Sequence, residues 1–236
     1  MTSCPVHVGR GSFDVGDGRR VKKSLRFLAM AFAAVLTVAP AAGASTMPDR
    51  LVASAPGLRP QVLALAMKAY EHARELGQTA SSIVTLIDYS LPSTERRLWV
   101  LDVRRGALLF HELVAHGRLS GDDLATSFSN RPGSQQSSLG SFVTGETYAG
   151  RHGLSLRLRG LDPGLNDNAE EREIVMHGAP YVSLEAARVL GHLGRSLGCP
   201  AVRPEVASRI IRTIKDGTFL FAYYPDPALQ SASYLN

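Results

Sequence analysis

The chain of 236 residues is 44% hydrophobic and 20% charged, which allows a sizeable apolar core and excludes a disordered or fibrous protein. The formal net charge of +5 comes mostly from residues 1–44. These hold six basic and two acidic side chains and leave 20 basic and 19 acidic ones in the other 192 residues. Because that remainder shows no basic stripe with interleaved aromatic residues, we exclude nucleic acid as a partner.

The N-terminal segment has the three parts of an export signal. These are a basic start (VKKSLRF, 21–27), an apolar run over 27–39 and a small-x-small cleavage site, AGA, at 42–44. The run of 13 residues is shorter than the roughly 20 that span a bilayer, although a retained membrane anchor stays the alternative. We therefore expect residues 1–44 to hold an upstream extension and a cleavable signal peptide. The mature protein would then be exported to the periplasm or cell envelope.

Residues 1–20 match no part of such a signal, so we hypothesise that translation starts at Val21. N-terminal mapping of the precursor would refute this by detecting a peptide from upstream of that residue. Under either start, cleavage removes Cys4 and leaves Cys199 as the one thiol of the mature chain. Exported proteins tend to keep cysteines for disulfides, so an unpaired cysteine calls for another explanation.

Residues 45–82 are expected to form a helical N-terminal segment. Within it, 58–76 has apolar residues at helical spacing, and Gly77 is a natural stop. His72 lies in this stretch, and we interpret it as a helix-surface residue. The predicted apolar face consists of Val62, Leu65, Ala66, Ala69 and Ala73.

Strand patterns begin at residue 83. IVTLIDY (83–89) is β-rich, and the RRG turn joins RRLWVLDV (96–103) to ALLFHELVAHG (107–117), which predicts a hairpin. The polar stretch 121–140 is too long for an ordinary connector and is either disordered or a functional loop. Further short strands are predicted at 141–148, 154–161 and 173–178.

Two helices and a closing strand complete the chain. SLEAARVLGHL (183–193) predicts a short helix. PEVASRIIRTIKDG (204–217) predicts a clear one, with Pro204 near its start and Gly217 at its end. Its apolar face consists of Val206, Ile210, Ile211 and Ile214. TFLFAYY (218–224) reads as a strand and the remaining residues as a tail. The prediction is a mainly β fold with flanking helices, in one domain over 83–236.

Cys199 lies in the stretch GRSLGCP at 194–200. A buried and inert cysteine is one interpretation. The residues around it form a Gly-bracketed turn and not an apolar stripe, which favours a reactive thiol.

A thiolate nucleophile needs a base, because free cysteine has a pKa of about 8.5. His177 is the best-placed candidate, since it ends an apolar strand before Gly178-Ala179-Pro180. His192 lies only seven residues before Cys199. We interpret His111 and His152 as structural residues. The role of His116 stays open.

The neighbours of the thiol suggest further roles. Pro200 has no N–H, so an oxyanion hole cannot use the amide after the nucleophile. Ser196 can orient the base or bind substrate, or it can simply form the turn. Arg195 and Arg203 can hold a substrate carboxylate. The competing chemistry is a zinc hydrolase with Cys199, His177 and His192 as ligands, but the chain has no HExxH or CxxC motif and no evident fourth ligand.

Together these motifs resemble the YkuD-type L,D-transpeptidases, in the branch of murein L,D-transpeptidase catalytic domains. The residues that carry the resemblance are Met176-His177-Gly178, Ser196-Leu197-Gly198-Cys199 and the upstream run Ser137–Phe142. The resemblance covers about residues 83–225. The separation of 22 positions from His177 to Cys199 is longer than the usual family spacing, and Leu197 and Pro200 depart from the common pattern.

The resemblance implies a β-sandwich-like catalytic domain that transfers acyl groups on peptidoglycan without a cofactor or a metal. Cys199 would be the nucleophile and His177 its base. The Gly198 and Cys199 amides would hold the oxyanion, with Ser196, Arg195, Gly178 and His192 as supporting residues. The tetrapeptide stems of peptidoglycan would be donor and acceptor, giving 3–3 cross-links, and carbapenem β-lactams would be inhibitors. The alternatives are L,D-carboxypeptidase activity, lipoprotein anchoring, or a non-catalytic cell-wall-binding module.

Overall fold

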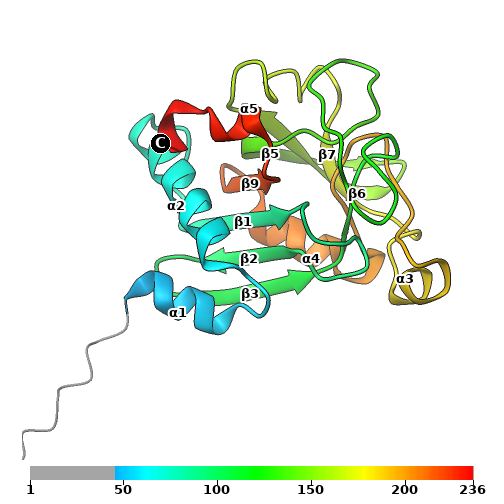
Figure 1. The fold of residues 1–236 in the computed structure, drawn as a ribbon, viewed down its shortest axis with the longest axis horizontal. Helices are drawn as coiled ribbons and strands as arrows, with labels where there is room; N and C mark the ends of the chain where they lie inside the picture. The colour runs from blue at the N-terminus through cyan, green and yellow to red at the C-terminus, as the bar shows by residue number, and fades with distance from the viewer. Residues whose placement is uncertain (1–45, 236) are drawn as a thin grey trace, which may run out of the picture. The chain divides into compact units, whose positions relative to one another are not determined.

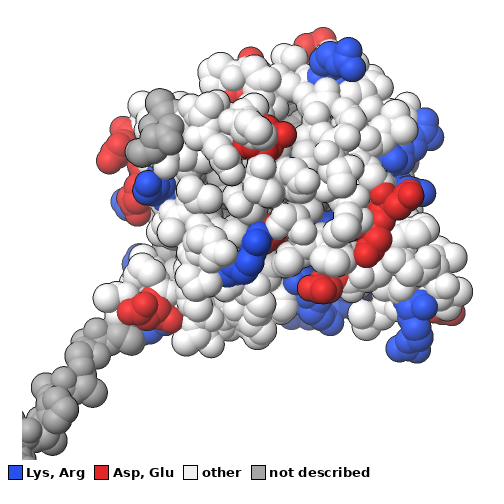
Figure 2. Space-filling view, in the orientation of Figure 1, with Lys and Arg blue, Asp and Glu red and all other residues white. Residues whose placement is uncertain are grey.

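The computed structural model describes residues 46–235 of the chain (Figure 1). The expected signal peptide, the start at Val21 and Cys4 lie outside these residues. Among residues 46–235, no helix is long and apolar enough to cross a membrane. Basic and acidic side chains are interspersed on the face drawn in Figure 2.

Two helices precede the first strand. α1 (Met47–Ser54) lies in the segment 45–82 that was expected to be helical, although no separate helix was predicted there. It starts with a capping box in which Thr46 and Asp49 exchange hydrogen bonds. α2 (Pro60–Glu75) confirms the predicted helix and ends before Gly77, whose φ is +67°. Of the predicted face all but Leu65 are buried, and Leu63 and Tyr70 join it because the apolar stripe is wider than predicted.

Nine strands form one mixed sheet in the order β3-β2-β1-β9-β5-β6-β7-β8-β4. The strands are β1 (Ile83–Asp88), β2 (Leu98–Asp102), β3 (Ala107–Glu112), β4 (Val114–Ala115), β5 (Gly140–Gly150), β6 (Gly153–Gly160), β7 (Val175–Gly178), β8 (Ala201–Val202) and β9 (Phe219–Tyr223). Two pairs, β1 with β9 and β7 with β8, are parallel, and the others are antiparallel. The predicted hairpin is β2–β3.

The order of the strands requires the sheet to curl. β3 and β4 are its two edges, yet only Leu113 separates them along the chain. Eight spacings of roughly 4.8 Å would hold the edges of a flat sheet about 38 Å apart, so the sheet bends until it nearly closes. The predicted mainly β fold with flanking helices is confirmed, with all nine strands in one sheet.

Helices α3 (Leu184–Leu190) and α4 (Pro204–Ile214) differ in how much of their surface is buried in the domain. α4 buries the predicted apolar face together with Ala207. It contacts β1 and the neighbouring strands β6 and β7. Because β1 lies three places from β6 in the sheet order, α4 packs on the concave side of the curled sheet. α3 buries no residue and projects from one side of the domain (Figure 1).

The expected tail at the C-terminus is wrong, because these residues fold and pack against α2 (Figure 1). α5 (Pro227–Gln230) is followed by a 3₁₀ turn at Ser233–Leu235. The Tyr234 ring stacks on His72 with centroids 5.0 Å apart, and its hydroxyl donates to Asp162 Oδ2 at 2.7 Å. His72 is therefore a packing partner and not simply a helix-surface residue.

Candidate active site

Strand pairing brings His177 and Cys199 into one cavity. β7 and β8 run in parallel, with His177 opposite Ala201. Cys199 precedes Ala201 by two residues and lies just outside β8, so this pairing brings the thiol close to the end of β7. Both residues line a cavity of about 550 Å³. Its other polar and charged walls include Tyr148, Arg151, His152, Glu173, Tyr181 and Arg195.

The His177 ring is oriented by its own backbone. Its Nδ1 lies 2.9 Å from the Gly178 carbonyl oxygen. A carbonyl oxygen only accepts, so Nδ1 carries the proton and Nε2 keeps its lone pair. Burial lowers the pKa of His177, and the Gly178 carbonyl partly opposes this. The imidazole is therefore neutral near pH 7, as a general base must be.

The Cys199 thiol is half-buried at the cavity wall. Its sulfur accepts from the Val175 N–H at 3.5 Å and lies 3.7 Å from the Glu173 carbonyl oxygen. Burial raises the pKa of the thiol, while the Val175 N–H, Arg172 and Arg151 lower it. In the described residues no hydrogen bond joins the sulfur to His177, so the geometry favours a neutral thiol–imidazole pair at rest.

The turn before the thiol is held by Ser196. Its Oγ donates to the Cys199 carbonyl at 2.6 Å and accepts from the Gly198 N–H at 3.0 Å. Ser196 therefore forms the turn, and it also lines the cavity, so its expected contact with substrate stays a prediction. The Gly198 N–H already donates to Ser196 Oγ, so the expected role of this amide in an oxyanion hole is not supported. The Cys199 N–H has no hydrogen-bond partner within residues 46–235 and is free to bind an oxyanion.

The two candidate arginines already have carboxylate partners. Arg203 makes a two-pronged contact with Glu112, at 3.0 Å from Nε to Oε2 and 2.7 Å from Nη2 to Oε1. Arg195 lines the cavity but pairs with Asp122. The expected substrate role of both is therefore weakened. Arg151 also lines the cavity and forms no ion pair within the described part of the chain.

His192 does not line this cavity; its Nδ1 bonds to the Leu193 carbonyl at 2.8 Å. The zinc alternative needed His192 beside His177 and Cys199, so it loses a ligand. Among residues 46–235, no three His, Cys, Asp or Glu side chains are close enough together to hold a metal ion.

His152 is a site residue that sequence reasoning missed. We expected a structural role, but it lies exposed on the turn between β5 and β6 and lines the cavity. Its ring stacks on His177 with centroids 4.4 Å apart and an interplanar angle of 23°. One sequence feature could have indicated a role for His152: two strand patterns meet at Gly150 and Gly153, which predicts a hairpin with His152 in its turn. The turn of a hairpin can reach the end of a neighbouring strand. Which strand end it reaches is not readable from the sequence.

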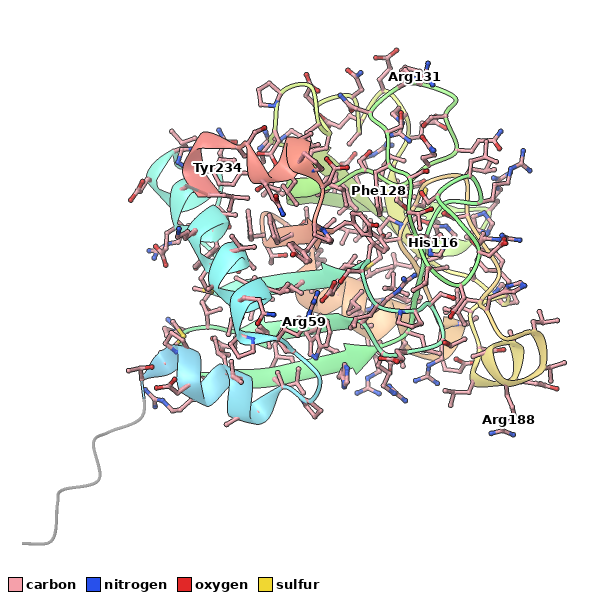
Figure 3. The ribbon with its side chains drawn as sticks, in the orientation of Figure 1. Arg59, His116, Phe128, Arg131, Arg188 and Tyr234 are labelled. Carbon is pink, nitrogen blue, oxygen red and sulfur yellow. The ribbon has the colours of Figure 1, made fainter. Side chains whose placement is uncertain are left out.

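His111 and His116 are structural. His111 bonds through Nε2 to the Arg96 carbonyl at 2.9 Å and stacks on Trp99. His116 is fully buried; Arg97 donates to its Nδ1 at 2.7 Å, and its Nε2 donates to the Gly121 carbonyl at 3.2 Å (Figure 3). Burial, with Arg97 adding to the effect, lowers the pKa of His116 to about 4.

The polar stretch 121–140 is irregular but firmly bonded. Ser137 Oγ accepts from the Gly117 N–H at 3.0 Å and donates to the Gly198 carbonyl at 3.1 Å. The stretch therefore supports the Gly198–Cys199 turn through hydrogen bonds, which argues against the disordered alternative; its function as a loop stays a prediction.

The family model for the L,D-transpeptidase catalytic domain matches residues 54–223. The chain belongs to this family. A search of curated proteins found no match. The catalytic-domain match begins before residue 83, so it takes in α2 but only the last residue of α1.

Solved structures with a similar fold include an L,D-transpeptidase from Mycobacterium smegmatis, at 12% identity and a TM-score of 0.38 over 61% of this chain and 59% of that one. The helical cell shape determining protein Pgp2 from Campylobacter jejuni is 14% identical, with a TM-score of 0.41 over 69% and 56% of the two chains. L,D-transpeptidase 3 from Mycobacterium tuberculosis, in complex with a faropenem-derived adduct, is 14% identical, with a TM-score of 0.40 over 61% and 60%. The chain thus spans less than two thirds of these proteins.

Proposed function

We propose that this chain is an exported L,D-transpeptidase that acts on peptidoglycan stem peptides through a Cys199 thioester. The observation that supports this best is that His177 and Cys199 line one cavity, with Nε2 of His177 free of the proton that Nδ1 carries. The match to the family supports the reaction class.

In the proposed reaction, His177 Nε2 takes the thiol proton as the sulfur attacks a stem-peptide carbonyl. By family resemblance, this is the carbonyl of the L-centre of diaminopimelate. The Cys199 N–H stabilises the oxyanion of the tetrahedral intermediate. When the tetrahedral intermediate collapses, the bond to the terminal D-Ala breaks, and the amine of D-Ala leaves with the proton returned by His177. An amine of a second stem then attacks the thioester and gives the 3–3 cross-link.

The charge of the cavity suits such a donor. Stem peptides carry carboxylates, and Arg151 offers a guanidinium with no ion-pair partner within the described residues. Tyr148 and Tyr181 add aromatic walls. Hydrolysis of the same thioester would make the enzyme an L,D-carboxypeptidase, and attack by a lipoprotein lysine would anchor that protein.

The test is the intact mass of the protein after incubation with a carbapenem, beside Cys199→Ala. We expect one adduct on the wild type and none on the variant. His192→Ala, outside the cavity, is the matched control and should keep most of the wild-type acylation. A wild-type thiol that stays unmodified would favour the wall-binding module. Incubation with tetrapeptide muropeptides then separates cross-linked from trimmed products.

A further inference from the structure

Arg172 lies on the turn that leads into β7, five residues before His177. It is part of neither the predicted nor the proposed catalytic pair. Its guanidinium is partly buried and makes four hydrogen bonds, all to uncharged acceptors of the 129–138 segment. The acceptors are the Ser129 carbonyl at 2.6 Å, the Gln136 carbonyl at 2.6 Å, Ser134 Oγ at 3.1 Å and Ser138 Oγ.

The segment 129–138 also contacts the turn that precedes the thiol of Cys199. Ser137 Oγ donates to the Gly198 carbonyl at 3.1 Å. A Cβ added at Gly198 would lie 2.8 Å from the Gln136 carbonyl oxygen and 3.3 Å from Arg172 Nη2. The guanidinium thus packs directly against the residue before the nucleophile.

The charge of Arg172 is not offset. No carboxylate pairs with it in the described residues, in contrast to Arg195 and Arg203, which have Asp122 and Glu112. Partial burial weakens screening by water, so the charge acts on its neighbourhood more strongly than that of a solvated arginine.

We propose that Arg172 is a positioning residue that fixes the 129–138 segment beneath Cys199 and supplies a positive charge that stabilises its thiolate. The inference deepens the proposed function and rests on Cys199 being its nucleophile. Two other ionisable groups change the pKa of the thiol: Arg151 lowers it and Glu173 raises it. In addition to burial, the thiolate in turn raises the pKa of Tyr181 and Tyr89. His177 faces the same cavity.

Two variants separate the charge from the hydrogen-bonding fork. Arg172→Gln removes the charge, whereas Arg172→Lys keeps it but loses the planar fork. Arg188→Gln is the matched control; it removes one positive charge from α3, which projects away from the domain (Figure 3).

The measurement is the pKa of Cys199 in the full chain, taken from the pH dependence of iodoacetamide alkylation of its peptide by mass spectrometry. An opposite charge nearby shifts a pKa by about one unit or more, so Arg172→Gln should lower the thiolate fraction at neutral pH on the order of tenfold. Arg172→Lys and Arg188→Gln should keep the wild-type pKa. Amide hydrogen exchange over 129–138 should accelerate in both Arg172 variants.

An unchanged thiol pKa in Arg172→Gln would overturn the inference, and so would unchanged exchange over 129–138. A pKa raised equally in the Gln and Lys variants would also overturn it, since the charge would then have no effect. If Arg172→Gln does not fold, Arg172→Met takes its place, because this change also removes the charge. The same outcomes then support or overturn the inference. Alkylation needs no stem peptide, so failure of the proposed transpeptidation would be seen separately.

Discussion

Replacing Ser196 by alanine tests whether this residue builds the nucleophile turn. Ser196 is only 5% exposed, and its hydroxyl makes two hydrogen bonds. The change removes both and leaves the Gly198 N–H and the Cys199 carbonyl without their partner. Each net hydrogen bond is worth about 1 kcal/mol, and an unpaired buried group costs more, so we expect a loss of roughly 2–4 kcal/mol in the free energy of unfolding.

For a domain of this size, such a loss lowers the melting temperature by roughly 4–16 °C. Thermal unfolding followed by circular dichroism measures the shift, and urea unfolding gives the free energy. Ser196→Thr keeps the hydroxyl and is the matched control, expected within about 1 kcal/mol of the wild type. Carbapenem acylation below the melting temperature should also slow, because the turn that positions the thiol relaxes. An alanine variant that melts like the wild type would refute the structural role of Ser196.

Three further outcomes are expected. His177→Ala should abolish carbapenem acylation while His192→Ala keeps most of it; an equal loss in both would show that the base is wrongly assigned. Gly198→Ala should lower stability by about 2–4 kcal/mol and block acylation, since φ is +127° and a Cβ would meet the Gln136 carbonyl oxygen at 2.8 Å. The pKa of His116 is about 4 in the folded chain against 6.5 normally, so only the unfolded state gains a proton as pH falls through this window. Stability should fall by about 3 kcal/mol between pH 6.5 and 4. Urea unfolding at several pH values measures it, and a slope unchanged in His116→Gln would contradict the assignment.

Local patterns were sufficient for most elements. The stripes of α2 and α4 and the strand that holds His177 were all readable, because each depends on residues a few positions apart. α1 was not predicted as a separate helix although Thr46 and Asp49 are a capping box, because a helix of eight residues shows little periodicity. The C-terminal residues were misjudged because Tyr234 gains its contacts from His72 and Asp162, which are distant in sequence.

Residue types and local spacing were enough to identify the reacting groups, which are one thiol in a Gly-bracketed turn and a histidine near a strand end. Which other groups surround them depends on contacts between distant parts of the chain. The parallel pairing of β7 with β8 is a long-range register that no local pattern encodes, and so is the reach of the β5–β6 turn to His177. Arg203 and Arg172 look alike in the sequence. Only packing pairs the first with Glu112 and leaves the second unpaired beneath the nucleophile, because side-chain partners are set by the fold as a whole.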